Sequence, residues 1–175
     1  VALEAGYRHV DCAPIYGNEA EVGQALRDAF DNGGVARDDV WITSKLWNDA
    51  HRPEDVRPAL EETLEDLQLE TLDLYLMHWP VALEPGVDMP ESPDDFLSPD
   101  DVSLADTWHA MEALVDEGLV RHIGVSNFSV PKLRTLMGEA DRAPEMNQIE
   151  MHPYLQQPEM LEFAAEQGLH LTAYS

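Results

Sequence analysis

Residues 40–78 read VWITSKLWNDAHRPEDVRPALEETLEDLQLETLDLYLMH, two apolar segments joined by an amphipathic one. The outer segments, Val40–Ser44 and Leu72–His78, are short apolar runs typical of buried strands. Between them, Glu54–Leu67 places its valine and leucines at helical spacing and its acids on the opposite side. A strand, a helix and a second strand in this order predict a β-α-β unit, with parallel strands and the helix packed outside the sheet.

The same alternation runs along the whole chain. Further strands are predicted at Tyr7–Cys12, His122–Ser126, Met146–Glu150 and His170–Tyr174. Further helices are predicted at Glu19–Asp31, Leu104–Glu117, Val130–Gly138 and Pro158–Gln167. The pattern predicts an α/β fold in which residues 1–175 form a single domain, because no domain linker or additional repeat interrupts it.

One connection differs in composition from the others. Residues 84–101 contain seven acids, no base and four prolines. A solvated connector is one interpretation. The other is a loop over the catalytic face, which in a β/α barrel is the face where the carboxyl ends of the strands converge, because the segment follows the strand that ends at His78.

The size of the chain is small for the fold that its pattern predicts. A complete eight-stranded β/α barrel needs about 250 residues, whereas this chain has 175. It opens on VALEAGY, which resembles the end of a helix, and closes on the strand HLTAYS. We therefore expect a piece of a longer protein, a partial barrel with two unpaired sheet edges that would aggregate or stay inactive alone.

Charge is the strongest compositional feature. Ten Lys and Arg oppose 35 Asp and Glu, for a formal net charge of −25. Such a surface repels phosphate backbones and anionic lipid, which argues against nucleic-acid and membrane partners. Only Lys45 and Lys132 are lysines, and we predict adaptation to high salt, where screening weakens self-repulsion. The single cysteine, Cys12, allows no internal disulfide and fits a reducing cytoplasm.

Four residues with complementary acid–base chemistry fall at or just after predicted strand ends: Asp11, Tyr16, Lys45 and His78. In a β/α barrel these ends converge on one face, where catalytic groups gather. A phenol gives up its proton reluctantly at neutral pH, and a nearby ammonium eases that loss. Lys45 can supply the ammonium, Asp11 can balance it, and His78 can bind a carbonyl oxygen as charge develops there. Each residue alone has an ordinary alternative, but together they predict carbonyl reduction.

Five motifs resemble the aldo-keto reductase family. In chain order they are GYRHVDCAPIYGNEAEVG (Gly6–Gly23), SKLW (Ser44–Trp47), DLYLMHWP (Asp73–Pro80), IGVSNF (Ile123–Phe128) and NQIEMHPY (Asn147–Tyr154). The resemblance extends over nearly the whole chain, in family order and with family-like spacing. Within the family, SKLWND (Ser44–Asp49) favours a prokaryotic type that resembles 2,5-diketogluconate reductases.

The resemblance implies a (β/α)8 TIM barrel, of which this chain covers about strands two to seven. It implies that Asp11, Tyr16, Lys45 and His78 form the catalytic tetrad, with Tyr16 as general acid. The implied activity is NAD(P)H-dependent reduction of aldehydes or ketones to alcohols. The substrate is expected to be a small carbonyl compound, and the full-length enzyme a cytoplasmic monomer.

The resemblance also assigns a cofactor site for NADP(H) or NAD(H), without a Rossmann domain. Ser126, Asn127 and Gln148 would bind the nicotinamide carboxamide, Tyr174 would stack on the nicotinamide ring, and Ser175 would begin the pyrophosphate loop. Trp47 and Trp79 would line the substrate pocket. From residue type alone, Gln148 could instead satisfy backbone groups, Asn127 could be a turn residue and Trp79 could belong to the core.

Two other functions stay open at this point. One is a redox-sensing regulatory or binding subunit of the same fold with slow turnover. The other is an aldolase that forms a Schiff base on Lys45. A metal site is not predicted, because the histidines lack paired ligand spacing and Cys12 is alone.

Overall fold

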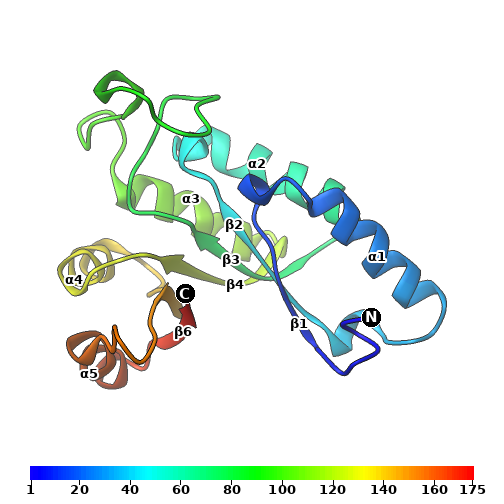
Figure 1. Cartoon of the computed structure of the whole chain (residues 1–175). Coiled ribbons are helices and arrows are strands. Elements are labelled where there is room, and N and C mark those ends of the chain that lie inside the picture. Colours follow the sequence, from blue (N-terminus) through cyan, green and yellow to red (C-terminus); the bar gives the residue numbers. More distant parts are fainter.

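The computed structural model describes residues 1–175 and contains one sheet of six strands with five α-helices (Figure 1). The strands are β1 (His9–Asp11), β2 (Trp41–Leu46), β3 (Leu72–Met77), β4 (Val120–Ser126), β5 (Met146–Glu150) and β6 (His170–Tyr174). The helices are α1 (Glu19–Asp31), α2 (Pro53–Leu67), α3 (Leu104–Asp116), α4 (Val130–Glu139) and α5 (Pro158–Gln167). Strands and helices alternate, and a short 3₁₀ turn lies in each of the first three strand-to-helix connections, at Pro14–Tyr16, Asn48–Ala50 and Pro93–Asp95.

All strand pairs are parallel, and the strands lie in chain order from β1 to β6. β1 and β6 each have one neighbour, so the sheet is an open arc rather than a closed barrel. This confirms the predicted α/β class with sequential parallel strands. Because every strand runs the same way, the carboxyl ends of all six meet at one edge.

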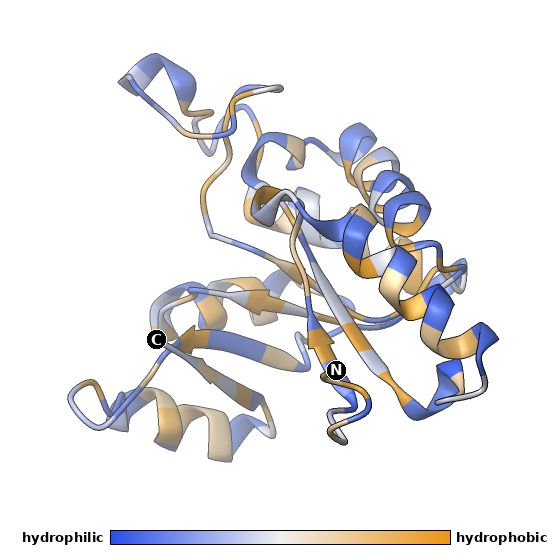
Figure 2. Cartoon of the chain, turned by 45° about the vertical axis from the view of Figure 1, so that its right-hand side comes forward, coloured by the Kyte–Doolittle hydropathy of each residue, from blue (hydrophilic) through white to orange (hydrophobic).

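The core lies between the outer face of the sheet and the helices. A cluster of 28 buried residues joins strand side chains such as Ile42 and Val125 to the inner stripes of the helices. The stripe predicted for α2 is confirmed, since Val56, Leu60 and Leu67 are fully buried. Figure 2 shows the opposite, hydrophilic sides of α1 and α2 facing away from the sheet.

The connection between β3 and α3 extends away from the sheet and helices (green in Figure 1). It contains a 3₁₀ turn at Pro93–Asp95 and one antiparallel bridge between Leu83 and Phe96. Its first half is tied to the segment after β2, because Trp47 Nε1 donates to the Asp88 carbonyl (3.0 Å) and the Gly86 N–H donates to Asp49 (3.3 Å). The acidic, proline-rich segment 84–101 therefore begins beside the strand ends, and its role as a loop over the catalytic face stays a prediction.

Several element ends differ from the expectation; β4, for example, begins at Val120, two residues before the predicted His122. β2 continues to Leu46, so Lys45 lies within the strand rather than after it. β1 is shorter than predicted and begins at His9. α2 starts at Pro53, one residue before the predicted Glu54. None of the helices has the length and apolar composition needed to span a lipid bilayer.

Candidate active site

The ammonium of Lys45 is the centre of the polar cluster at the carboxyl ends of β1 to β3. Its Nζ donates to Asp11 Oδ1 (2.6 Å), to the Cys12 carbonyl (2.9 Å) and to the Tyr16 hydroxyl (3.2 Å). Lys45 is 0% exposed. A buried ammonium is tolerated because each of its three hydrogens has an oxygen partner, one of them a carboxylate.

His78 follows β3 and lies beside Tyr16. The two rings meet edge to face, with centroids 6.1 Å apart, and Trp47 lies on another side of the imidazole at 5.0 Å. Burial, reinforced by the Lys45 charge, lowers the pKa of His78 to about 4. His78 is therefore a neutral imidazole at neutral pH, and its buried Nδ1 has no hydrogen-bond partner.

Gln148 reaches this cluster from β5, which is not a neighbour of β1. Its Nε2 donates to Asp11 Oδ2 at 2.7 Å, so the two oxygens of Asp11 are held by Gln148 and Lys45. Gln148 and Asp11 are 137 positions apart in the chain. The contact spans the concave side of the sheet and brings part of the expected cofactor site against the expected tetrad.

The other residues assigned to the carboxamide also contact one another. Ser126 Oγ donates to the Gln148 carbonyl (2.8 Å), and Asn127 Nδ2 donates to Ser126 Oγ (3.1 Å) and to the His78 carbonyl (2.9 Å). Asn127 has a φ of 64°, a left-handed conformation that asparagine tolerates better than most residues. The Tyr174 hydroxyl donates to Asn127 Oδ1. These residues lie together, whereas Ser175 follows β6 and makes no side-chain hydrogen bond.

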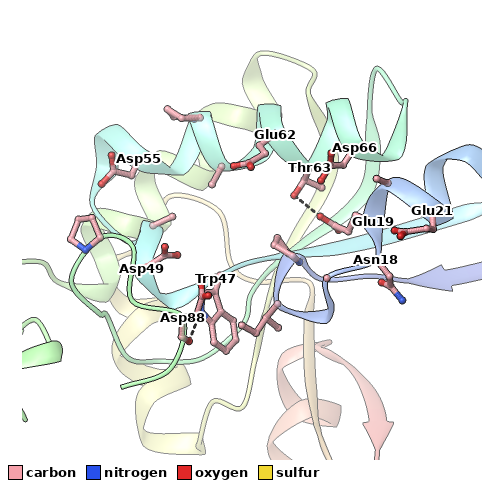
Figure 3. A pocket seen from close by; sticks show the side chains of 18 residues that line it. Asn18, Glu19, Glu21, Trp47, Asp49, Asp55, Glu62, Thr63, Asp66 and Asp88 are labelled. Carbon is pink, nitrogen blue, oxygen red and sulfur yellow. Dashed lines mark hydrogen bonds between the residues drawn. The ribbon is translucent and has the colours of Figure 1, made fainter. Parts of the chain in front are cut away.

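The two tryptophans line different cavities. Trp47 lines one of about 680 Å³ beside α2, and Trp79 lines one of about 410 Å³ that also includes Asn127 and Tyr174. The larger cavity has seven acidic residues and no basic residue on its walls (Figure 3). Burial raises the pKa of one of them, Asp49.

Two buried side chains next to the cluster, those of Cys12 and Glu19, form no hydrogen bond with its members. Burial, together with the charges of Glu19 and Asp11, raises the pKa of Cys12 to about 12. The Cys12 thiol is therefore protonated and a poor nucleophile. Glu19 accepts hydrogen bonds from Ser44 (2.6 Å) and Thr63 (3.1 Å), and burial raises its pKa.

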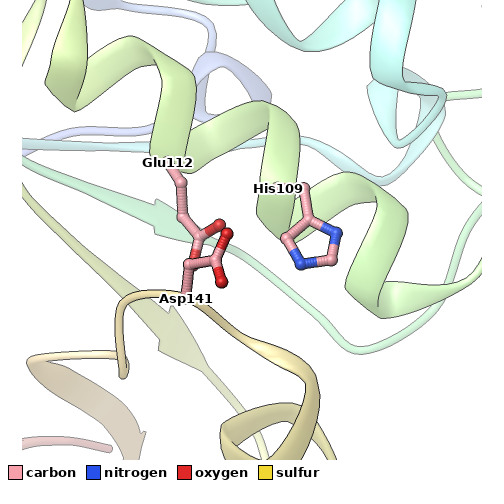
Figure 4. Close-up of side chains that lie close together, drawn as sticks. All are labelled: His109, Glu112 and Asp141. Atoms are coloured by element: carbon pink, nitrogen blue, oxygen red, sulfur yellow. The ribbon is translucent and has the colours of Figure 1, made fainter.

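A separate group of potential metal ligands lies on α3 and the loop after α4. Ligand atoms of His109, Glu112 and Asp141 lie within 4.8 Å of one another (Figure 4). Glu112 accepts the Arg142 N–H (2.6 Å), and His109 Nε2 contacts the Glu139 carbonyl (3.1 Å). Through these bonds Glu112 and His109 join α3 to the end of α4 and to the loop after it. The sequence has no paired histidine spacing at this group, because His109 and Glu112 lie one helical turn apart and Asp141 lies in a separate loop.

The Gln148–Asp11 contact and the Cys12 carbonyl partner of Lys45 were not anticipated from the sequence. Neither has a local signal, because a backbone carbonyl has no residue-type signature and strands β1 and β5 are not adjacent.

Comparison with known proteins places this geometry in context. The aldo/keto reductase family profile matches residues 1–175. An aldo/keto reductase of Synechocystis sp. is 57% identical over 174 residues, which cover 99% of this chain and 53% of the relative. Aldo-keto reductase family 1 member A1 of Sus scrofa is 51% identical over 176 residues, with 99% and 54% covered. This chain therefore spans about half the length of the curated relatives it matches.

Solved structures give the same result. The aldose reductase from Schistosoma japonicum superposes with a TM-score of 0.93 at 46% identity, and 99% of this chain and 58% of that chain are covered. The aldose reductase from Giardia lamblia gives a TM-score of 0.94 at 47% identity with the same coverage. The profile match, the identities and the shared half-barrel agree, and we conclude that the chain belongs to the aldo/keto reductase family.

Proposed function

We propose that the protein reduces aldehydes or ketones to alcohols with NADP(H) or NAD(H), and that Tyr16 is the general acid. The observation that carries the proposal is the Tyr16 hydroxyl 3.2 Å from the Lys45 ammonium, beside the neutral ring of His78. A phenol next to a fixed positive charge is suited to release a proton, because the charge stabilises the phenolate left behind.

The residues near this acid fit a nicotinamide cofactor. A carboxamide needs hydrogen-bond donors and acceptors, which Ser126, Asn127 and Gln148 provide at the ends of β4 and β5. Gln148 Oε1 accepts no hydrogen bond within the protein and is the acceptor left for the carboxamide. Tyr174 is 37% exposed and can present its ring to a flat partner.

Bound reduced nicotinamide would supply the hydride that adds to the carbonyl carbon. Tyr16 then gives its proton to the carbonyl oxygen, and the O–H bond of the product alcohol forms as the phenolate is left on Tyr16. Lys45 stabilises that phenolate, and Asp11 keeps the ammonium in place. His78, neutral at pH 7, donates an N–H to the carbonyl oxygen and orients it.

The competing functions receive less support. A Schiff base needs a free amine, and all three hydrogens of Lys45 are donated to oxygen partners. A redox-sensing subunit has no supporting observation in the fold or the relatives. The similarity of SKLWND to 2,5-diketogluconate reductases stays a prediction. A cytoplasmic location is likewise proposed, and the single buried cysteine, Cys12, is consistent with it.

Replacement of Tyr16 with Phe tests the proposal. In the full-length gene product, NADPH and NADH oxidation is followed against a panel of aldehydes and ketones at high salt. We expect kcat to fall by about 10²-fold or more in Tyr16→Phe, with cofactor affinity nearly unchanged. Tyr154→Phe is the matched control, because Tyr154 is 98% exposed. A Tyr16→Phe enzyme with wild-type turnover would rule out the assignment.

A further inference from the structure

The side-chain amide of Gln148 lies between the expected tetrad and the expected carboxamide site. Its Nε2 donates to Asp11 Oδ2 at 2.7 Å, and its Oε1 accepts no hydrogen bond within the protein. Gln148 is buried, with 6% of its surface exposed. The amide thus holds the carboxylate with one end and leaves the other end for a ligand.

The base of this side chain is fixed as well. The Gln148 carbonyl accepts Ser126 Oγ (2.8 Å) and the Asn127 N–H (2.9 Å), and Gln148 pairs with Thr172 of β6. A side chain with a fixed backbone can orient its partner rather than follow it. Asp11 is the more exposed member of the pair, with a side chain that is 39% exposed.

From Asp11 the contacts continue to the proton donor. Asp11 Oδ1 accepts from Lys45 Nζ at 2.6 Å, and Lys45 Nζ donates to the Tyr16 hydroxyl at 3.2 Å. A carboxylate that rotates about its own axis would change the distance of Oδ1 to the ammonium. The N–H of Gln148 opposes that rotation, because it binds the second oxygen.

We propose that Gln148 is a positioning residue for the proton donor, because the Gln148–Asp11–Lys45–Tyr16 contacts couple the expected carboxamide site to the catalytic hydroxyl. This proposal rests on the proposed function, because the position of the Tyr16 hydroxyl affects turnover only if Tyr16 is the general acid.

The first test does not require turnover. The full-length gene product is labelled with ¹⁵N-lysine, so that its side-chain ammonium signals include those of Lys45 and Lys132. Lys45→Arg and Lys132→Arg each remove one signal and thereby assign these two. We expect Gln148→Met, which removes the donor at similar volume, to shift or broaden the Lys45 signal and to leave that of Lys132 unchanged.

Tyr174→Phe is the matched control. Tyr174 belongs to the same expected cofactor site, but its hydroxyl donates to Asn127 Oδ1 and not to Gln148 or Asp11, so the Lys45 signal is expected to stay in place. An unchanged Lys45 signal in folded Gln148→Met overturns the proposal. If Gln148→Met does not fold, Gln148→Glu keeps the size of the side chain. Its Lys45 signal is then expected to move as the new carboxyl ionises, and a constant signal over that pH range overturns the proposal equally.

The second test is the pH profile of kcat in the full-length enzyme. Without the N–H from Gln148, the negative charge of Asp11 offsets more of the positive charge of Lys45. The ammonium then stabilises the Tyr16 phenolate less. We expect the alkaline limb of kcat in Gln148→Met to move to higher pH by about half a unit or more, and kcat to fall about tenfold. A residue that only anchors cofactor would raise the cofactor KM and leave kcat and its pH profile unchanged, which overturns the proposal. A wild-type enzyme that reduces no carbonyl defeats the proposed function, while the lysine spectra still decide the positioning role.

Discussion

The carboxylate of Asp11 lies 2.6 Å from the ammonium of Lys45 on the neighbouring strand. The strand register explains the pairing, because Asp11 is opposite Thr43 and Lys45 is two residues further along β2. Side chains two positions apart point to the same side of a strand. The parallel pairing thus sets the ion pair on the concave side of the sheet, where the convergent strand ends gather polar groups.

Lys45→Met tests the importance of this ion pair. The substitution keeps the aliphatic stem and removes the charge that faces Tyr16, so the phenolate loses its nearest stabilising group. We expect kcat for carbonyl reduction to drop by about 10²-fold or more, while circular dichroism shows the fold retained. Lys132→Met is the control, since Lys132 is exposed and contacts only the Pro80 carbonyl (3.1 Å). Wild-type activity in Lys45→Met would contradict the mechanism.

Two buried histidines predict how stability depends on pH. Burial lowers the pKa of His51 to about 4, and the pKa of His78 is lowered to about the same value. In the unfolded chain each titrates near its ordinary pKa of about 6.5. Between these pH values the unfolded state binds more protons, so the free energy of unfolding falls as pH drops from about 6.5 to 4 and is flat above that range.

His51→Leu isolates one of these contributions. Both ring nitrogens of His51 lack hydrogen-bond partners, so the change breaks no side-chain hydrogen bond. Between pH 7.5 and pH 5, we expect the variant to lose about 2 kcal/mol less unfolding free energy than wild type. Urea unfolding at the two pH values and constant salt measures the difference. Equal losses in the two proteins would contradict the prediction.

Gly23 sets how closely α1 approaches α2. A Cβ at this position would lie 2.2 Å from the Asp66 carbonyl oxygen and 2.7 Å from backbone atoms of Leu67. Because the obstacle is backbone, the helices must separate, and we expect Gly23→Ala to cost about 3 kcal/mol.

Gly138→Ala is the matched control for that variant. Gly138 is in α4, and a Cβ there meets nothing within 4 Å. We expect it to stabilise the protein by about 0.5–1 kcal/mol, because alanine loses less backbone entropy in a helix. Urea unfolding of the two variants measures both effects. A Gly23→Ala protein as stable as wild type would show that the helices do not contact as described.

The net charge of −25 predicts a dependence on salt. Molar KCl shortens the screening length to roughly 3 Å and weakens repulsion between surface carboxylates. We expect Tm to rise by about 5 °C or more between 0.1 and 2 M KCl, which corresponds to ~2 kcal/mol for a domain of this size.

A variant with fewer acids on one helix sharpens the salt test. Glu62, Glu65 and Asp66 are exposed on α2, and conversion to the matching amides removes three negative charges. The triple variant is expected to show a smaller rise in Tm across the same KCl series. A wild-type Tm that does not rise with molar KCl would contradict salt adaptation.

Much of the secondary structure could be predicted from the sequence, because hydrophobic periodicity is a local property. The ends of α1, α5, β5 and β6 agree with the expected Glu19–Asp31, Pro158–Gln167, Met146–Glu150 and His170–Tyr174. The extent of β2 was predicted less well. A lysine normally marks the end of a buried strand, and only its oxygen partners on other segments allow Lys45 to remain inside one.

By itself, the sequence determined the order of strands and helices, the acidic surface and the residue types that gather at the strand ends. The tertiary structure alone decided which atoms meet there. Gln148 reaches Asp11 across 137 positions and between strands that are not neighbours, so no local pattern encodes the contact. Periodicity depends on a few adjacent residues, whereas the orientation of a buried carboxylate depends on the curvature of the whole sheet and on every partner that the curvature brings within hydrogen-bonding distance.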